Sequence, residues 1–120
     1  MPKFTKPSTG TLATFAGAID GVPGIEHRVM FGYPSVFLNG NMLACVFQDR
    51  IMVRLSEDDR ADAMAGGGKP FEPSPGRAMK EYVELPPAVT RAPAALRRWI
   101  ERGREYVERL PKKAKKKRSK

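Results

Sequence analysis

The chain has 120 residues, of which 41% are hydrophobic and 29% are charged, and its formal net charge at pH 7 is +9. These values are typical of one soluble globular domain with a single core, and they exclude collagen-like, largely disordered and membrane-embedded chains. Because no apolar run approaches the roughly 18 residues of a membrane-spanning helix and residues 1–7 lack the apolar stretch of a secretory signal, we expect a cytoplasmic protein.

The first predicted element is a short helix that follows a lead-in. Residues 1–7 contain two prolines and show no periodicity, which predicts a flexible segment. Apolar residues then repeat at the spacing of one helix face: Leu12, Phe15, Ala16 and Ile19. With Ser8 or Thr9 available as the N-cap and Gly21 at the other end, the pattern predicts a helix with one apolar face.

Strands are predicted next. Residues 25–30 alternate between apolar and polar side chains, which predicts a strand, and residues 31–34 interrupt it. The pairs Asn39-Gly40 and Gln48-Asp49 then separate three apolar runs. Asn-Gly favours the two-residue turn of a β-hairpin, because both central residues of a type I′ turn need positive φ. The sequence therefore predicts a three-stranded antiparallel meander over residues 35–38, 41–47 and 50–55.

The faces of this meander follow from the predicted register, in which two-residue turns pair Leu38 with Asn41 and Phe47 with Arg50. One face then holds Phe37, Met42, Ala44, Val46, Ile51, Val53 and Leu55. The other holds Val36, Leu38, Leu43, Cys45, Phe47 and Met52, relieved only by Asn41, Arg50 and Arg54. Since a sheet with one solvated face alternates more cleanly, we expect a helix of this chain or another subunit to cover the second face.

The rest of the chain is predicted to be mainly helical. A second helix starts at Ser56, has acids in its first turn and ends at Gly66-Gly67-Gly68. Residues 71–77 are predicted to be a loop, and residues 78–85 a strand. From about Pro93 to Leu110 a helix is indicated by apolar residues at helical spacing: Leu96, Trp99, Ile100, Gly103, Tyr106, Val107 and Leu110.

Several short motifs occur in a fixed order along the chain. They are Met30-Phe31-Gly32, Leu38-Asn39-Gly40-Asn41-Met42-Leu43-Ala44, Asp49-Arg50-Ile51, Glu81-Tyr82-Val83-Glu84-Leu85-Pro86 and Ala95-Leu96-Arg97-Arg98-Trp99-Ile100. As an ordered set they resemble the N-terminal domain of the TfoX/Sxy family of bacterial competence regulators, over residues 8–108. At Tyr33-Pro34-Ser35 many members have glycine, an aromatic and glycine, so the chain resembles a branch with a Met-Phe-Gly-Tyr-Pro motif.

The resemblance implies a compact α+β domain with an antiparallel sheet and flanking helices, known as a regulatory or interaction domain and not as a catalyst. The full regulators resemble a two-domain arrangement with a second, helical domain. In this sequence a basic tail follows the domain instead of a second, helical domain. The resemblance therefore implies a role in transcriptional co-activation only weakly.

Few residues of this chain are suited to catalysis or to metal binding. Cys45 is the only cysteine and His27 the only histidine, too few for a zinc site of four Cys/His ligands. A Cys-His nucleophile needs both side chains in contact, whereas Cys45 lies within a predicted strand and is expected to be a small buried hydrophobe. Residues 57–59 suit a helix N-terminus, and Pro70 after Gly66-Gly67-Gly68-Lys69 does not fit a phosphate-binding loop. We therefore expect no catalytic, cofactor or metal site.

A candidate partner-binding surface is predicted around the corner between the first two strands. Loops carry function more often than cores do, and the aromatic residues of this corner are candidates for a surface position. The predicted surface consists of Phe31, Tyr33, Pro34, Arg77, Lys80 and Tyr82. Packing of these residues within the turn is the alternative interpretation.

The end of the sequence is strongly basic, and seven of the nine net positive charges lie there. They are Lys112, Lys113, Lys115, Lys116, Lys117, Arg118 and Lys120. Blocks of like charge are usually disordered interaction arms, so this tail is a candidate nucleic-acid contact. A solvated tail without a partner is the alternative.

Together these patterns predict one α+β domain over residues 8–110, followed by a disordered lysine-rich tail over residues 111–120. In this domain an antiparallel sheet, formed by the meander of residues 35–55 and flanking strands, packs against N- and C-terminal helices. The predicted function is a non-catalytic regulatory module that binds a protein partner or itself, as a dimer for example, without cofactor, metal or membrane. The alternative is a non-specific nucleic-acid-binding protein that acts through its basic tail.

Overall fold

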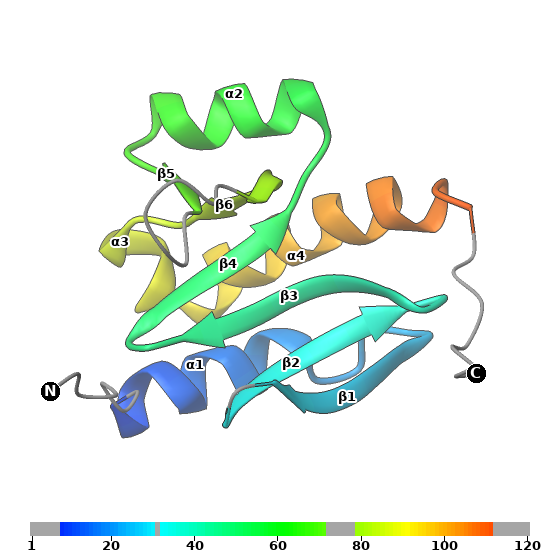
Figure 1. Ribbon diagram of the computed structural model, residues 1–120. Coiled ribbons are helices and arrows are strands. Elements are labelled where there is room, and N and C mark those ends of the chain that lie inside the picture. The colour runs from blue at the N-terminus through cyan, green and yellow to red at the C-terminus, as the bar shows by residue number, and fades with distance from the viewer. Residues whose placement is uncertain (1–7, 31, 72–78, 112–120) are drawn as a thin grey trace, which may run out of the picture.

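A computed structural model describes residues 8–30, 32–71 and 79–111, so the predicted lead-in and the lysine-rich tail lie outside the described residues. Its elements are α1 (Thr9–Ile19), β1 (Ile25–Met30), β2 (Tyr33–Leu38), β3 (Asn41–Phe47), β4 (Arg50–Arg54), α2 (Glu57–Ala65), β5 (Lys69–Phe71), β6 (Met79–Glu84), α3 (Pro87–Thr90) and α4 (Pro93–Glu108). Figure 1 shows how these elements are arranged. The α+β class and the antiparallel sheet are confirmed.

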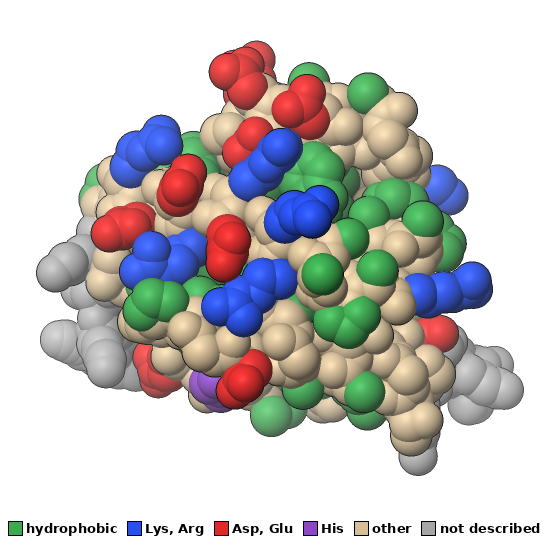
Figure 2. Space-filling view, turned by 180° about the vertical axis from the view of Figure 1, so that it is seen from behind, with side chains coloured by type: hydrophobic (Ala, Val, Ile, Leu, Met, Phe, Trp, Pro, Cys, Tyr) green, Lys and Arg blue, Asp and Glu red, His purple; other side chains and the backbone are tan. Residues whose placement is uncertain are grey.

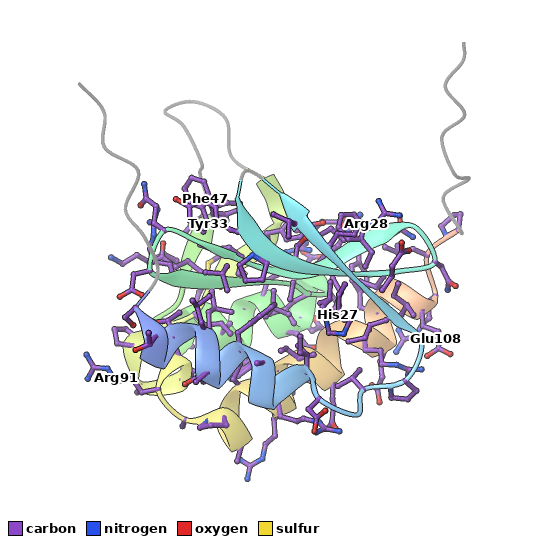
Figure 3. All side chains as sticks on the ribbon, turned by 90° about the horizontal axis from the view of Figure 1, so that it is seen from below. His27, Arg28, Tyr33, Phe47, Arg91 and Glu108 are labelled. Carbon is purple, nitrogen blue, oxygen red and sulfur yellow. The ribbon has the colours of Figure 1, made fainter. Side chains whose placement is uncertain are left out.

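The sheet has six strands in the order β1-β2-β3-β4-β6-β5, and every neighbouring pair is antiparallel. The helices lie on one side of it, as the view along the sheet in Figure 3 shows. The main core lies between the two layers, and it contains side chains such as Phe15 of α1, Ala63 of α2 and Ile100 of α4. The opposite face of the sheet carries no described helix, and we call it the open face.

α1 is confirmed, with Ser8 as its N-cap: the backbone N–H of Thr11 donates to Ser8 Oγ at 3.1 Å. Its buried face differs from the predicted one. Phe15 and Ile19 are buried as expected, but Ala18 joins them, whereas Leu12 and Ala16 are exposed. The helix is therefore rotated about its axis, because α4 and the sheet together decide which side is covered.

The turns of the meander are confirmed. Asn39 and Gly40 have φ values of 54° and 83°, as a type I′ turn requires, and Leu38 lies opposite Asn41. At the next turn Phe47 lies opposite Arg50. The N-terminal end of β2 extends two residues beyond the predicted strand, so the corner between β1 and β2 is a tight hairpin that pairs Met30 with Tyr33.

A β-bulge makes the predicted face assignment wrong. Val36 lies opposite Ala44 and Phe37 opposite Met42, which leaves Leu43 as an extra residue in β3. The core on the helix side therefore takes Val36, Leu38, Leu43, Ala44, Val46, Ile51, Val53 and Leu55. The open face takes Phe37, Met42, Cys45, Phe47 and Met52. Helices thus cover Val36, Leu38 and Leu43 of the predicted second face, but not Cys45, Phe47 and Met52.

Two elements were not predicted. β5 contains Pro70, and a proline in the sequence argues against a central strand. The proline is tolerated because β5 lies at the edge of the sheet. α3 begins at Pro87 and is one short turn of helix. Neither element has a periodic sequence pattern, so tertiary contacts determine both.

α4 packs across β3 and β4 with Leu96, Ile100, Gly103 and Val107 buried, as its periodicity predicted. The helix comes closest to the sheet at Gly103. A Cβ atom there would lie 2.6 Å from the carbonyl oxygen of Arg54 and 2.8 Å from a methyl group of Val53. Only glycine therefore allows this spacing between the helix and the sheet.

Candidate interaction surface

The open face has its own apolar cluster, which is separate from the main core. Its buried members come from β3, β4, β5 and β6, and they are Met42, Cys45, Met52, Phe71 and Tyr82. Phe37 and Phe47 pack against this cluster and are half-buried. The cluster gives the open face an apolar layer, and charged side chains lie over its aromatic rings.

Tyr82, one of the predicted surface residues, lies in this layer and is only 8% exposed. Its hydroxyl donates a hydrogen bond to the carbonyl oxygen of Met42 at 2.9 Å, so it joins β6 to the bulged part of β3. Burial raises the pKa of Tyr82 to about 12. The ring therefore stabilises the open face from within.

Tyr33 is also buried, with 6% of its surface exposed. Its ring makes an edge contact with Phe47 at 5.4 Å between centroids, and Phe47 makes another with Phe71 at 5.5 Å. These contacts form an aromatic row across the sheet, and Figure 3 shows Tyr33 and Phe47 together on the side away from the helices. Tyr82 thus belongs to the cluster of the open face, whereas Tyr33 is grouped with the main core and reaches the open face through Phe47. Both are buried residues and not exposed aromatics.

The remaining predicted surface residues are distributed differently. Pro34 is half-buried, and it lines a groove beside α1 on the helix side. Phe31, Arg77 and the side chain of Lys80 lie outside the described residues. The described part of the chain therefore does not bring Pro34 together with Tyr33 and Tyr82, and a partner-binding role for this set stays a prediction.

Arginine side chains cover the aromatic rings of the open face. The guanidinium carbon of Arg28 lies 4.5 Å from the centroid of Phe37, that of Arg50 lies 5.7 Å from Phe47, and that of Arg54 lies 5.6 Å from Tyr82. At these distances a guanidinium group is attracted electrostatically to the face of the ring. The sequence had suggested only that Arg50 and Arg54 interrupt an apolar face. The stacking lies across three strand pairs, β1–β2, β3–β4 and β4–β6, and the last of these joins strands that are far apart in the sequence.

Each of these arginines also has a carboxylate partner. Arg28 pairs with Glu26 at 3.2 Å, Arg50 with Glu84 at 2.9 Å and Arg54 with Glu81 at 2.7 Å. The positive charge of this row is therefore balanced locally. We call these arginines, Glu26, Glu84 and the rings beneath them the arginine–aromatic surface; Glu81 is left out because Tyr106 of α4, on the helix side, donates a hydrogen bond to it at 2.9 Å.

On the helix side of the molecule, charged side chains pair between helices instead of lying over a layer of aromatic rings. Figure 2 shows Lys and Arg side chains interspersed with Asp and Glu, without a region of one sign. Arg102 of α4, for example, contacts Asp59 and Asp62 of α2 at 3.4 and 3.5 Å, and it stacks on Trp99 at 4.6 Å. These charges link the helices to one another.

His27 and Cys45 lie on opposite faces of the sheet. His27 lies opposite Val36 of the main core, and Figure 3 shows it directed toward the helix side. Cys45 belongs to the cluster of the open face, and burial raises the pKa of its thiol to about 12. The sheet separates the two side chains, so the histidine cannot deprotonate the thiol. The prediction that Cys45 is a buried hydrophobe is confirmed.

Within residues 8–30, 32–71 and 79–111, no group of three or more His, Cys, Asp or Glu side chains is placed to hold a metal ion. Among the same residues, no helix is long and apolar enough to span a membrane.

Comparison with known protein families gives a match to the family described as the TfoX N-terminal domain, over residues 18–106. The matched range runs from the end of α1 to near the end of α4, and it includes the whole sheet. No curated protein matches the chain.

Proposed function

The chain belongs to the TfoX N-terminal domain family, and on that premise we propose that it is a non-catalytic regulatory module, acting in the cytoplasm, that binds a protein partner or a second copy of itself. Membership of the family suggests a regulatory or interaction domain. The observation that carries the proposal is the arginine–aromatic surface on the side of the sheet that no described helix covers.

The composition of this surface suits a protein partner. Arginine and aromatic residues are enriched at protein interfaces, and a planar guanidinium group can bind a carboxylate through two hydrogen bonds. Phe37 and Phe47 are half-buried, so a partner could complete their burial. Because carboxylates balance the arginines, the surface lacks the excess positive charge that binding to a phosphate backbone requires.

Arg50 offers a direct test of this surface. We would immobilise the domain without residues 112–120 and compare proteins captured from a bacterial lysate with those captured by Arg50→Ala. This variant removes the contacts to Phe47 and Glu84. Arg98→Ala, on the exposed side of α4, is the matched control. We expect about a tenfold loss of a specific captured protein with Arg50→Ala only. Equal capture by all proteins, or no specific capture, would contradict the proposal.

The second candidate function is non-specific binding of nucleic acid through the basic tail, and the seven positive charges within residues 112–120 favour it. If about five of them contact duplex DNA, the logarithm of the affinity should fall against the logarithm of salt concentration with a slope of roughly −4 to −5. Truncation after Pro111 tests this directly. DNA affinity that survives the truncation unchanged rules out the tail as the determinant.

A further inference from the structure

The two edges of the sheet differ in how they are protected. β5 at one edge has three residues, contains Pro70 and is bulged against β6, all features that limit pairing with another strand. β1 at the other edge has six residues, contains no proline and pairs with β2 without a register shift. In the described part of the chain β1 pairs with β2 alone, so its outer edge carries no strand.

The hairpin between β1 and β2 determines which backbone groups of β1 point outward. A two-residue turn closes on a hydrogen-bonded pair, here Met30 and Tyr33, and hydrogen-bonded pairs then alternate along the strands. The carbonyl of Arg28 accordingly faces β2, where it accepts a hydrogen bond from Ser35 Oγ at 3.1 Å. By the same alternation the N–H and C=O groups of Ile25, His27 and Val29 point away from the sheet.

We propose that the outer edge of β1 pairs in antiparallel orientation with β1 of a second copy of this chain, around a two-fold axis at His27. The two sheets then form one continuous sheet. This inference rests on the proposed function, since it specifies where an interaction module would bind itself.

The charges of β1 are self-complementary in this register. A two-fold axis at His27 places Glu26 opposite the partner's Arg28, and Arg28 opposite the partner's Glu26. Both side chains lie on the same face of the strand and already reach each other within one chain, at 3.2 Å. Glu26 and Arg28 have inward-facing backbone groups, so the cross-chain pairs are the closer, non-hydrogen-bonded type, in which opposite charges attract best.

The same charges exclude the neighbouring registers. An axis at Glu26 would oppose two glutamates, and an axis at Arg28 would oppose two arginines. Like charges directly across strands are destabilising, so only the axis at His27 pairs every charge with its opposite. An isologous interface requires this kind of self-complementarity, which favours a second copy over an unrelated strand.

The apolar residues of β1 support the same arrangement. Val29 is 73% exposed, the highest value among the large hydrophobic residues that the structure describes, and in this register it meets the partner's Ile25. A groove between α1 and β1 continues the apolar surface, and its lining includes Leu12, Ala16 and Ile25. Figure 3 looks onto this edge, with α1 beside β1. Pairing of two edges would cover Val29 and close the groove from outside.

Charge reversal gives a sharp test by sedimentation velocity over a wide range of protein concentration. Glu26→Arg opposes arginines in its own dimer, and Arg28→Glu opposes glutamates, so we expect each variant alone to dimerise about tenfold or more weakly than the native chain. An equimolar mixture should recover the native affinity, because every cross-chain pair is again of opposite charge. Glu101→Arg and Arg98→Glu make the same charge changes on α4 and should leave dimerisation unchanged.

The proposal is overturned by a native chain that stays monomeric at every concentration, by single variants that dimerise like the native chain, or by a mixture that does not recover. Thermal melting of each variant shows whether the fold is retained. Failure here is distinguishable from failure of the proposed function: specific capture that depends on Arg50, by a protein that does not dimerise through β1, would leave the interaction module intact and refute only the β1 pairing.

Discussion

At the scale of single residues, the open face depends on polar groups that are fully paired. Among the described residues, no buried side-chain nitrogen or oxygen lacks a hydrogen-bond partner. The hydroxyl of Tyr82 satisfies the carbonyl of Met42, next to the bulge at Leu43. Removing one partner of a buried hydrogen bond costs stability, because the other polar atom is then left without a hydrogen bond in a place that water does not reach.

Tyr82→Phe should therefore destabilise the protein. The substitution keeps the ring and removes one buried hydrogen bond, and we expect the free energy of unfolding to fall by about 1–2 kcal/mol. Urea denaturation measures the change. Tyr106→Phe is a useful comparison, because its hydroxyl contacts the half-buried Glu81, which water can reach, and we expect the smaller loss there. An equal loss in both variants would contradict the role given to burial.

Cys45 predicts a specific dependence of stability on pH. Its pKa is raised from 9.0 to about 12 in the folded protein, so the unfolded chain releases this proton first as the pH rises. The stability that the buried thiol contributes is complete below pH 9 and is lost as the pH rises from 9 toward 12. Relative to Cys45→Ala, we expect the native chain to lose about 1.4 kcal/mol of additional stability between pH 8 and pH 10.

Chemical denaturation at several pH values measures this difference. Burial is the largest cause of the raised pKa of Tyr82, and Cys45 is a smaller one, so the difference between the two proteins reports mainly on the thiol. Parallel pH profiles for the two proteins would show that Cys45 is not buried as a neutral group.

At the scale of elements, the distance between α4 and the sheet is set by one glycine. Gly103 lets α4 lie against the backbone of Arg54 and the side chains of Val53 and Leu43. Glycine costs helix stability, so its presence within α4 reflects this close approach and not the preference of the helix.

Two glycine substitutions separate these effects. Gly103→Ala should lower the free energy of unfolding by about 1–3 kcal/mol, because the new methyl group overlaps the backbone of β4. Gly17→Ala in α1 has room, since the nearest side-chain atom, in Pro93, lies 3.9 Å from the new carbon. We expect that variant to be stabilised by about 0.5–1 kcal/mol. Thermal or urea unfolding of both variants measures the sign of each change in the free energy of unfolding. Stabilisation by Gly103→Ala would refute the close packing of α4 on the sheet.

At the scale of the whole molecule, every buried residue that the structure describes lies between Thr14 and Val107. Among the described residues, the hydrogen bond nearest the C-terminus runs from Asn41 Nδ2 to the carbonyl of Pro111, at 3.1 Å. The described core is therefore complete without residues 112–120.

Truncation after Pro111 should leave folding intact. We expect its free energy of unfolding to stay within about 0.5 kcal/mol of the native value, the range typical of changes away from the core. Urea denaturation at moderate salt measures this. A larger loss would mean that the basic segment contributes to the stability of the domain, and it would remove the basis for using truncation in the binding experiments.

What the sequence determined by itself is mostly local. The caps at Ser8 and Ser56, the Asn39-Gly40 turn and the periodicity of α4 depend on residues close together in the chain, and the three helices and the turn that they predict are confirmed. The family that the sequence resembles is likewise confirmed, by the match over residues 18–106.

The tertiary structure decided which residues meet. The bulge at Leu43 moved Phe37 and Met42 to the open face, and with them the stacking of Arg28 on Phe37. β5 and the buried positions of Tyr33 and Tyr82 also follow from strands far apart in the sequence. Alternate side chains of a strand point to opposite faces of the sheet, so the sequence predicts the faces only when the pairing is uninterrupted. One extra residue in a bulge moves every later side chain of the strand to the other face.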